Sequence, residues 1–420
     1  MIQKIKKNEF VKHLIQLTMG SALAQIITIL VSPLSTRLFS SEQLGSYTLF
    51  LTVVSIFGPI LNLKYDMSIV KSKDECETIN AFSLSSLIGI FMSIFISIFY
   101  SIYLFFNEKL VDEIGYLIYL LLPIILIGTS LVNTLTSYNN LEKKYGLISK
   151  VYVIRTAWQN VLLIIAGMFK TGALGLIISQ TLSVFWGIKM QSSSIREKWM
   201  DLKSLISRQQ MIKILKKEKR QFLFLTPATL LNTGSYSILN FLITSLYGLS
   251  IFGYYSISYR ILGLPLNLIS GNVSRVFYQK AVEDVNSGKP FYSTLKKFLI
   301  LVTLIAIPMV LFLYYLSPTI FSVFFGKDWR ISGEFVRYLA PMYGIRLIVS
   351  SVSVSLIVAN KQQLELVLQA LFIIYNIIIF FVARFFTLMP NIFLVLISIG
   401  YSFIYLLFII LIIYFSRKKV

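Results

Sequence analysis

The stretch IFLVLISIGYSFIYLLFIILIIYF, residues 392–415, contains no charged side chain over 24 residues. A transmembrane helix needs about 20 consecutive apolar residues, so this stretch predicts a helix that crosses a lipid bilayer. Eleven further stretches are also predominantly apolar and about long enough to span a membrane. They lie at about residues 14–36, 44–70, 79–106, 114–136, 148–169, 172–189, 222–247, 251–278, 295–316, 335–359 and 364–386.

The composition of the whole chain supports the same interpretation. Of its 420 residues, 56% are hydrophobic and only 14% are charged. A soluble domain carries about a quarter charged residues, because polar surface must cover its core. This chain lacks that surface. We therefore expect an all-α integral membrane protein with about twelve transmembrane helices.

The formal net charge of +21 carries a topological signal. Lysine and arginine favour one of the two sets of loops between the predicted spans by about five to one. The positive-inside rule assigns that set, and with it both termini, to the cytoplasm. We expect a multi-pass protein of the bacterial cytoplasmic membrane with no nucleic-acid partner. The basic set includes Lys4, Lys6, Lys7, Lys12, Lys71, Lys73, Lys143, Lys144, Lys150, Lys280, Lys289, Lys296, Lys297, Lys361, Arg417, Lys418 and Lys419, and the opposite set holds Arg37, Lys109, Lys170, Lys327 and Arg330.

A polar segment divides the chain into two halves of six predicted spans. We expect an N-lobe at residues 1–190, a cytoplasmic linker at 191–221 and a C-lobe at 222–420. In the linker, apolar residues recur at near-helical spacing between lysines and arginines, as in a basic amphipathic helix on an anionic inner leaflet. A plain connection between two lobes explains the segment as well, and the two interpretations are compatible. The apolar residues are Trp199, Leu202, Leu205, Ile206, Ile212 and Leu215.

A short internal repeat supports the two-lobe interpretation. Gly45 and Tyr47, at the start of the second span, match Gly253 and Tyr255 at the start of the eighth. Both halves contain six spans and begin on the same side of the membrane. We therefore expect a parallel repeat whose pseudo-two-fold axis lies along the membrane normal.

Several cations lie within predicted spans. A cation at the centre of a transmembrane helix costs about 2.5–3.5 kcal/mol on insertion scales, so such a residue usually faces a cavity. Arg346 lies near the middle of its span and Arg260 about a third of the way into the eighth, and we favour a functional role for both. Arg275 lies nearer the cytoplasmic end of the same span. Four cations lie near span ends, where contact with lipid headgroups explains them equally well: Arg37, Lys64, Arg155 and Arg337.

Acidic side chains are much rarer in the spans. Asp66 lies well within one, and Glu365 lies at the edge of another. Two acids cannot neutralise the cations, so we expect a water-filled, electropositive cavity between the lobes that holds an anion such as a diphosphate. Asp66 or Glu365 could couple transport to a proton or a sodium ion, although Asp66 could equally pair with a lysine. Amide and aromatic side chains could bind sugar hydroxyls, although each is more often a helix-packing contact: Gln25, Asn62, Asn240, Asn267, Tyr259 and Tyr343.

The sequence predicts no catalytic residue, no metal site and no cofactor. Its only cysteine is Cys76 and its only histidine is His13, so ligand clusters of these residues cannot form. The phosphate-binding pattern GxxxxGK[ST] does not occur, which argues against ATP hydrolysis by this chain. No predicted outer loop exceeds about twenty residues. We therefore do not expect an enzyme.

Two stretches resemble a known family. FVKHLIQLTMGSALAQIITILVSPLSTRLFSSEQLGSYTLF (10–50) and YGLSIFGYYSISYRILGLPLNLISGNVSRVFYQKA (247–281) are similar to polysaccharide-export flippases, the O-antigen and capsule repeat-unit translocases of the multidrug/oligosaccharidyl-lipid/polysaccharide exporter superfamily. The second stretch contains the spacing G-x-Y-x4-R-x4-P. The resemblance implies twelve or more helices in two lobes around a cationic cavity that opens alternately to each side. Carried onto matching positions, it implies that Arg37, Lys64, Arg260 and Arg275 line this cavity; Arg346 lies outside the shared motifs and is added on physical grounds.

The resemblance also implies the cargo, an oligosaccharide on undecaprenyl diphosphate moved from the inner to the outer leaflet. Our main hypothesis is therefore a flippase for surface polysaccharide (O-antigen or capsule) synthesis, working beside glycan polymerase or ligase machinery. One alternative is an ion-coupled multidrug exporter of the same superfamily. Such exporters tend to use acids in the first lobe, where this chain has only Asp66. A second alternative is a membrane glycan polymerase or ligase.

Overall fold

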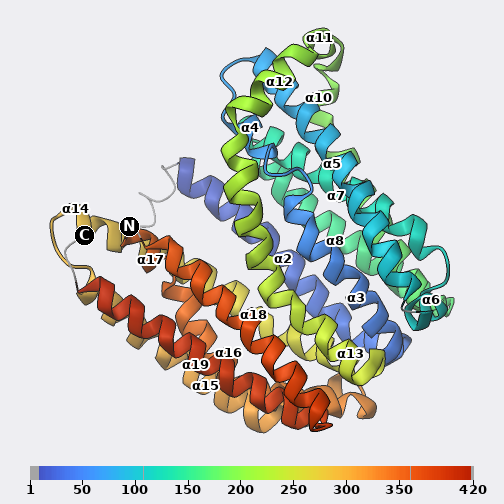
Figure 1. Ribbon diagram of the computed structural model, residues 1–420, viewed down its shortest axis with the longest axis vertical. Helices are drawn as coiled ribbons and strands as arrows, with labels where there is room; N and C mark the ends of the chain where they lie inside the picture. The colour runs from blue at the N-terminus through green and yellow to red at the C-terminus, as the bar shows by residue number, and fades with distance from the viewer. Residues whose placement is uncertain (1–8, 107, 360, 418–420) are drawn as a thin grey trace. The chain divides into compact units, whose positions relative to one another are not determined.

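The structure is a computed structural model that describes residues 9–106, 108–359 and 361–417, and every element in these ranges is helical (Figure 1). The chain forms two compact units that meet in sequence between Thr233 and Gly234. Five lysines that contribute to the predicted orientation lie outside the described residues: Lys4, Lys6, Lys7, Lys418 and Lys419.

Unit 1 contains the helices from α2 to η2 and the start of α13. In order these are α2 (Glu9–Leu38), α3 (Ser41–Phe57), η1 (Gly58–Ile60), α4 (Asp66–Val70), α5 (Glu75–Phe105), α6 (Glu108–Ile114), α7 (Ile118–Leu141), α8 (Tyr145–Met168), α9 (Gly172–Gln191), α10 (Ser193–Arg196), α11 (Trp199–Lys203), α12 (Arg208–Lys217) and η2 (Gln221–Leu225). α13 (Thr226–Pro265) crosses into unit 2, which continues with η3 (Leu266–Ser270), α14 (Gly271–Asn286), α15 (Tyr292–Phe324), η4 (Lys327–Trp329), α16 (Arg330–Val352), α17 (Ser355–Val358), α18 (Gln362–Phe385) and α19 (Pro390–Ser416).

The number of spans follows from the length of α13. Among the described residues, eleven helical segments are long and apolar enough to cross a membrane, and one of them, Ser237–Asn286, is 50 residues long. The 40 residues of α13 alone would extend about 60 Å, twice the thickness of the hydrocarbon core. Gly248 interrupts it with φ 81° and ψ 178°, a backbone conformation that glycine adopts without steric cost. α13 therefore contains the seventh span and the start of the eighth, and the prediction of about twelve transmembrane helices is confirmed.

Small residues allow the helices of unit 1 to pack closely. α8 packs against α2 and α9, and α7 packs against α5 and α9. Gly20 on α2 marks one close approach of two backbones, since a Cβ atom there would lie 2.9 Å from the Cα atom of Ser149 on α8. Close backbone approach through small residues is the usual way in which transmembrane helices associate.

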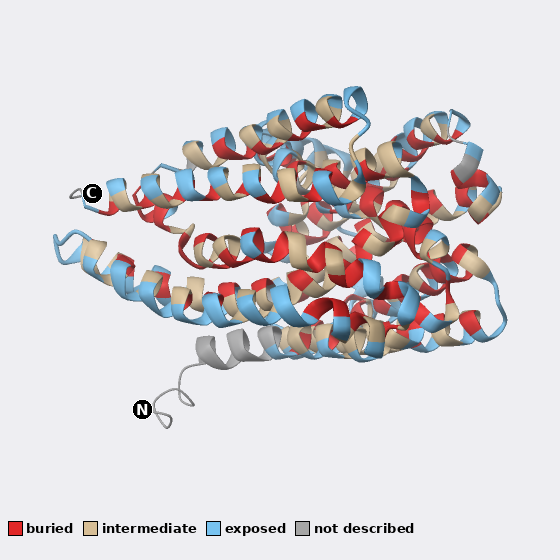
Figure 2. Ribbon diagram, turned by 90° about the horizontal axis from the view of Figure 1, so that it is seen from below, coloured by how far each residue is buried: buried red, intermediate tan, exposed pale blue. Residues whose placement is uncertain are grey.

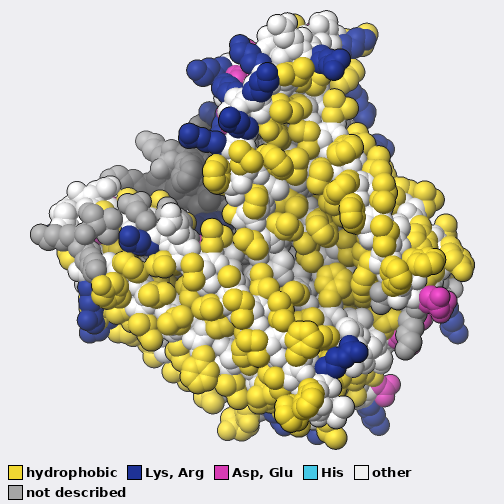
Figure 3. Space-filling model, viewed as in Figure 1, with side chains coloured by type: hydrophobic (Ala, Val, Ile, Leu, Met, Phe, Trp, Pro, Cys, Tyr) yellow, Lys and Arg dark blue, Asp and Glu magenta, His cyan; other side chains and the backbone are white. Residues whose placement is uncertain are grey.

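Exposed residues lie along the outward faces of the helices (Figure 2), and most of the side chains on the face seen in Figure 3 are hydrophobic. Phe91 on α5 is 68% exposed and Phe381 on α18 is 62% exposed. Exposed apolar surface on this scale is unusual in a water-soluble protein, whereas lipid covers it at no cost. In unit 2, α16 forms the centre, because it packs against both α15 and α19, and α18 packs against α19.

The linker packs onto unit 1 as the separate short helices α10, α11 and α12. Asn80 on α5 binds the loop between α11 and α12: its Nδ2 donates to the carbonyl of Leu205 (2.9 Å), and its Oδ1 accepts from the backbone N–H of Ser207 (2.8 Å). Leu202 and Ile214 are buried in a hydrophobic cluster with residues of α5 and α7. Lysine and arginine gather at this end of unit 1 (Figure 3).

The predicted lobe limits remain predictions. The two units of the structure divide within α13, after Thr233, rather than in the linker. One cause is a hydrogen bond that ties the start of α13 to α3, from Thr233 Oγ1 to the carbonyl of Ile56 (3.1 Å).

Candidate functional site

The second span of unit 1 is broken. Pro59 lies in η1, and residues 61–65 form turns before α4 begins at Asp66. Within this break Leu63 and Lys64 have φ values of 46° and 64°. This left-handed conformation costs an L-residue roughly 1–2 kcal/mol, so the surrounding structure must hold it in place.

Asn62 holds the break. It is 2% exposed, and its Nδ2 lies 2.9 Å from Thr134 Oγ1, 3.0 Å from Ser130 Oγ and 3.1 Å from Ser85 Oγ. An amide nitrogen has two hydrogens, so it donates to two of these oxygens at a time. Because its acceptors belong to α5 and α7, Asn62 fixes the broken span against both helices. The Asn62 side chain therefore serves helix packing, and it is not accessible to a sugar hydroxyl.

The break carries the charged pair Lys64 and Asp66. Both side chains are half-buried, and the charge of Lys64 acts on the Asp66 carboxylate. Ser137 on α7 donates a hydrogen bond to Asp66 Oδ2 (3.5 Å). Lys64 and Asp66 thus place an amine and a carboxyl group close together where a span loses its helical hydrogen bonds.

A second polar cluster of unit 1 surrounds Tyr47, one of the repeated tyrosines. Gln159 Nε2 donates to its hydroxyl (3.0 Å), which in turn donates to Gln180 Oε1 (3.4 Å). Arg155 lies one turn before Gln159 on α8, so its guanidinium lies in the same neighbourhood as the phenols of Tyr47 and Tyr152. No acid pairs with Arg155 among the residues that the structure describes.

Arg155 lies ten residues, or about 15 Å, after the start of α8 at Tyr145. The sequence placed it one or two turns inside the cytoplasmic boundary of its span and left its role open between headgroup contact and function. Gln159 and Gln180 are the residues of this cluster that sequence reasoning did not single out, and the i, i+4 spacing of Arg155 and Gln159 was the signal available.

Unit 2 holds a matching cluster around Tyr255, the other repeated tyrosine. Tyr255 is 4% exposed, its ring stacks on that of Tyr259 with 6.2 Å between the ring centres, and Tyr343, Tyr401 and Arg346 lie in its neighbourhood. The guanidinium of Arg346 donates to the Tyr343 hydroxyl and lies 5.4 Å from the centre of its ring. An interior arginine therefore lies beside a repeated tyrosine in each unit.

The remaining predicted residues lie apart from these clusters. Arg260 is half-buried on α13, one residue after Tyr259; Arg275 is exposed on α14, about 22 Å further along the chain if helical rise is assumed. Arg37 is exposed in the last turn of α2. Glu365 is half-buried in the first turn of α18 and forms no ion pair with another described residue.

The other predicted sugar-binding groups also differ in access. Tyr259 is 38% exposed, whereas Tyr343 and Asn240 are buried. Gln25 is half-buried, and the side chain of Asn267 lies outside the described residues. In the described part of the chain, no three His, Cys, Asp or Glu side chains lie close enough to hold a metal ion.

Solved structures identify the class of fold. The chain is similar to the lipid II flippase MurJ in an inward closed conformation, with a TM-score of 0.67 and 17% identity over 96% of this chain and 87% of that one. It is also similar to an inward-facing multidrug resistance MATE family transporter of the MOP superfamily, with a TM-score of 0.62 and 14% identity over 95% and 94% of the two chains. A MOP superfamily transporter from Pyrococcus furiosus gives a TM-score of 0.60 and 14% identity over 97% and 96%. The protein therefore has the fold of MOP-superfamily transporters.

The family follows from the sequence itself. A family profile described as "Polysaccharide biosynthesis protein" matches residues 34–333, which is most of the chain. The chain belongs to this family, and the predicted resemblance to polysaccharide exporters and flippases is confirmed. No curated protein matched the sequence.

Proposed function

We propose that this protein is a flippase that moves undecaprenyl-diphosphate-linked oligosaccharide repeat units from the inner to the outer leaflet by alternating access. The product would serve the synthesis of a surface polysaccharide such as O-antigen or capsule. The cargo would reach the outer leaflet chemically unchanged, so the protein would not be an enzyme. Its termini would lie in the cytoplasm of a cell bounded by this inner membrane, and a glycan polymerase or ligase would use its product.

One observation carries this proposal: the interior arginines lie beside tyrosine hydroxyls. Arg155 neighbours Tyr47 and Tyr152, and Arg346 donates to Tyr343 beside Tyr255. A phenol orients a guanidinium without cancelling its charge, and guanidinium is well suited to bind phosphate through two parallel hydrogen bonds. Glutamine side chains around Tyr47 add donors and acceptors that match sugar hydroxyls.

The test is a translocation assay with the whole protein in vesicles. A fluorescent lipid-diphosphate-linked oligosaccharide is placed in one leaflet, and its transfer is measured by a quencher that cannot cross the membrane. The double variant Arg155→Gln, Arg346→Gln should lose transfer. Arg330→Gln is the matched control, because Arg330 forms an exposed ion pair with Glu334 (3.7 Å) at the start of α16. Full transfer by the double variant would refute the assignment of these arginines.

The same vesicles distinguish the alternatives. Similarity to MATE transporters leaves an ion-coupled exporter of small molecules as the second candidate. In that case cationic drugs would be transported and the lipid-linked oligosaccharide would not. A polymerase or ligase would instead lengthen the oligosaccharide or release it from its lipid, which thin-layer chromatography of the recovered cargo detects.

Ion coupling is proposed for Asp66 and Glu365. Asp66 is the stronger candidate, because it lies in the broken span beside Lys64 and accepts from Ser137. Asp66→Asn should make transfer independent of a proton or sodium gradient. Unchanged gradient dependence in both Asp66→Asn and Glu365→Gln would exclude the two carboxylates.

A supporting role for anionic lipid at the cytoplasmic face is also proposed. Several apolar linker residues remain at least 36% exposed beside lysines and arginines, although Leu202 and Ile214 are buried. The exposed ones are Trp199, Leu205, Ile206, Ile212 and Leu215. They leave an amphipathic surface that suits an anionic leaflet.

A further inference from the structure

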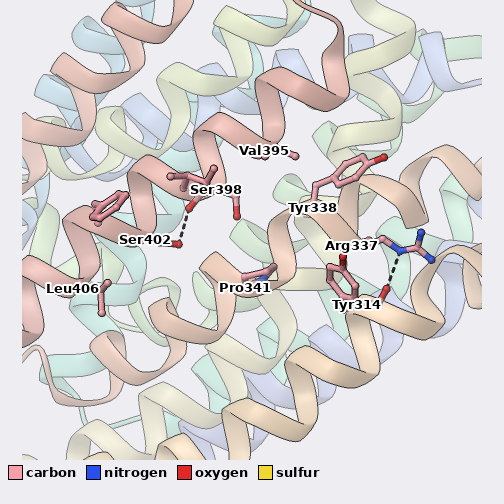
Figure 4. A pocket seen from close by; sticks show the side chains of 10 residues that line it. Tyr314, Arg337, Tyr338, Pro341, Val395, Ser398, Ser402 and Leu406 are labelled. Carbon is pink, nitrogen blue, oxygen red and sulfur yellow. Dashed lines mark hydrogen bonds between the residues drawn. The ribbon is translucent and has the colours of Figure 1, made fainter.

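Unit 2 has a groove that is separate from the tyrosine–arginine cluster. It has a volume of about 360 Å³ and lies between α15, α16 and α19 (Figure 4). Its walls include Tyr314 of α15, Arg337 and Pro341 of α16, and Ser398, Phe403 and Leu406 of α19. We call it the Arg337 groove.

The walls of the Arg337 groove are apolar along most of its length. The Ser402 hydroxyl donates to the carbonyl of Ser398 (2.6 Å), so it offers no donor to a ligand. Phe403 and Leu406 remain 68% and 43% exposed, which leaves the groove open at the surface of the unit. Proline helps to shape it: Pro341 has no N–H for the carbonyl of Arg337 four residues earlier, so the helical hydrogen bond is missing there.

The groove has the length of one lipid leaflet. Its α19 wall runs from Val395 to Leu406, which is about 16 Å at helical rise. Half of a hydrocarbon core of about 30 Å is about 15 Å. An acyl chain that lies along α19 would therefore fit from the headgroup region to the middle of the membrane.

A single cation marks one end of the groove. Arg337 Nε donates to the carbonyl of Tyr314 (2.9 Å), and the guanidinium lies 5.8 Å from the centre of the Tyr314 ring. Its two terminal nitrogens point away from the α19 wall, while Leu406 lies at the opposite end (Figure 4). Arg337 forms no ion pair with an acid among the described residues, unlike Arg330 on the same helix, which pairs with Glu334.

We propose that the Arg337 groove binds one anionic phospholipid. The phosphate contacts the terminal nitrogens of Arg337, and one acyl chain lies against α19. The positive-inside rule places this end of α16 on the outer side, so the lipid belongs to the outer leaflet. The combination of a fixed guanidinium with an apolar groove of one-leaflet length favours a phospholipid over a soluble anion, because a soluble anion would have no apolar part to fill the groove. The proposal does not depend on the cargo of the transporter.

The test measures lipid retained by the full-length protein in detergent, using native mass spectrometry after addition of phosphatidylglycerol or phosphatidylcholine. The unsubstituted protein should retain one phosphatidylglycerol per groove in preference to phosphatidylcholine. Arg337→Gln should reduce that preference about tenfold, which corresponds to the loss of one charge-assisted contact. Arg330→Gln, the matched control, should retain the preference.

A second variant tests the apolar part of the site. Ile399 lines the groove and is 49% exposed, so Ile399→Trp should fill the groove without disturbing the core and should reduce retention of both lipids. Equal retention by Arg337→Gln and the unsubstituted protein would overturn the proposal. It would also be overturned if undecaprenyl diphosphate displaced the phospholipid completely at equal concentration, because the groove would then serve the cargo.

Discussion

Asn62 should be a main contributor to the stability of unit 1, and Asn62→Leu tests this. Leucine has the same branching at Cγ but no donor, so the substitution removes the two hydrogen bonds that the amide makes to oxygens of α5 and α7. Hydrogen bonds between transmembrane helices contribute about 0.6–2 kcal/mol each, because the unfolded chain in a membrane also finds partners. The expected loss is therefore about 1–4 kcal/mol.

The size of this stability loss depends on whether the oxygens that accepted from Asn62 keep other hydrogen-bond partners in the variant. Thr134 Oγ1 also donates to the carbonyl of Ser130 (3.1 Å) and lies 3.0 Å from Ser85 Oγ. These oxygens keep other partners, so the full cost of a buried unsatisfied group does not apply and we expect about 2 kcal/mol. For a unit of this size the unfolding temperature should fall by about 4–8 °C.

The assay is thermal unfolding of the purified protein in detergent, followed by tryptophan fluorescence. Asn160→Leu is the matched control, because Asn160 is also buried in unit 1, but its Nδ2 donates only within its own helix, to the carbonyl of Thr156 (2.8 Å). Asn62→Leu should lower the unfolding temperature at least twice as far. If the two variants unfold at the same temperature, Asn62 does not fix the broken span.

Two further predictions concern packing and pH. Gly333→Ala should destabilise unit 2 by about 1–3 kcal/mol, because the new Cβ would lie 2.6 Å from the Cα atom of Pro318. Gly263→Ala is the control, because a Cβ atom at position 263 has no neighbour within 4 Å. In the same unfolding assay this variant should be as stable as the unsubstituted protein or more stable. Burial raises the pKa of the Glu218 carboxyl, but hydrogen bonds from Lys71 and Gln221 and the charges of Lys71 and Lys217 outweigh this and leave the pKa below its ordinary value of 4.5. The ion pair of Glu218 with Lys71 (3.0 Å) therefore stabilises the docked linker above pH 4.5, and this stabilisation is lost as the pH falls below 4.5. Hydrogen exchange in α12, corrected for the intrinsic rate, should be unchanged between pH 7 and 5 and should rise only at lower pH. A rise in exchange already at pH 6 would contradict this prediction.

The sequence was sufficient to predict the approximate number of transmembrane helices, because each span is determined by the length and apolarity of a local stretch. It could not predict the break at residues 61–65. Pro59 indicated only a kink, whereas the left-handed conformation of Leu63 and Lys64 is imposed by Asn62 through partners on α5 and α7, which are distant in sequence. Local patterns carry no information on such partners.

The polar cluster around Tyr47 was missed for a related reason. Hydropathy locates a span, but it does not show that Gln159 of α8 and Gln180 of α9 meet at the Tyr47 hydroxyl. The repeated tyrosines were visible in the sequence, but the arginine beside each one comes from another helix: α8 supplies Arg155 for Tyr47, and α16 supplies Arg346 for Tyr255.

Gln180→Glu tests whether the positive charge of Arg155 serves to bind the cargo. Gln180 accepts from the Tyr47 hydroxyl (3.4 Å), so the new carboxylate would lie in the same polar cluster as the Arg155 guanidinium. An interior arginine costs about 2.5–3.5 kcal/mol on insertion scales, and an internal counter-charge should offset part of this cost. The variant should therefore unfold at a higher temperature than the unsubstituted protein and transfer less cargo, since the phosphate must then compete with the introduced carboxylate for Arg155. Gln159→Glu places a carboxylate on the other side of the same hydroxyl and should act in the same direction. A gain in stability without a loss of transfer, in both variants, would mean that Arg155 serves the fold and does not bind the cargo.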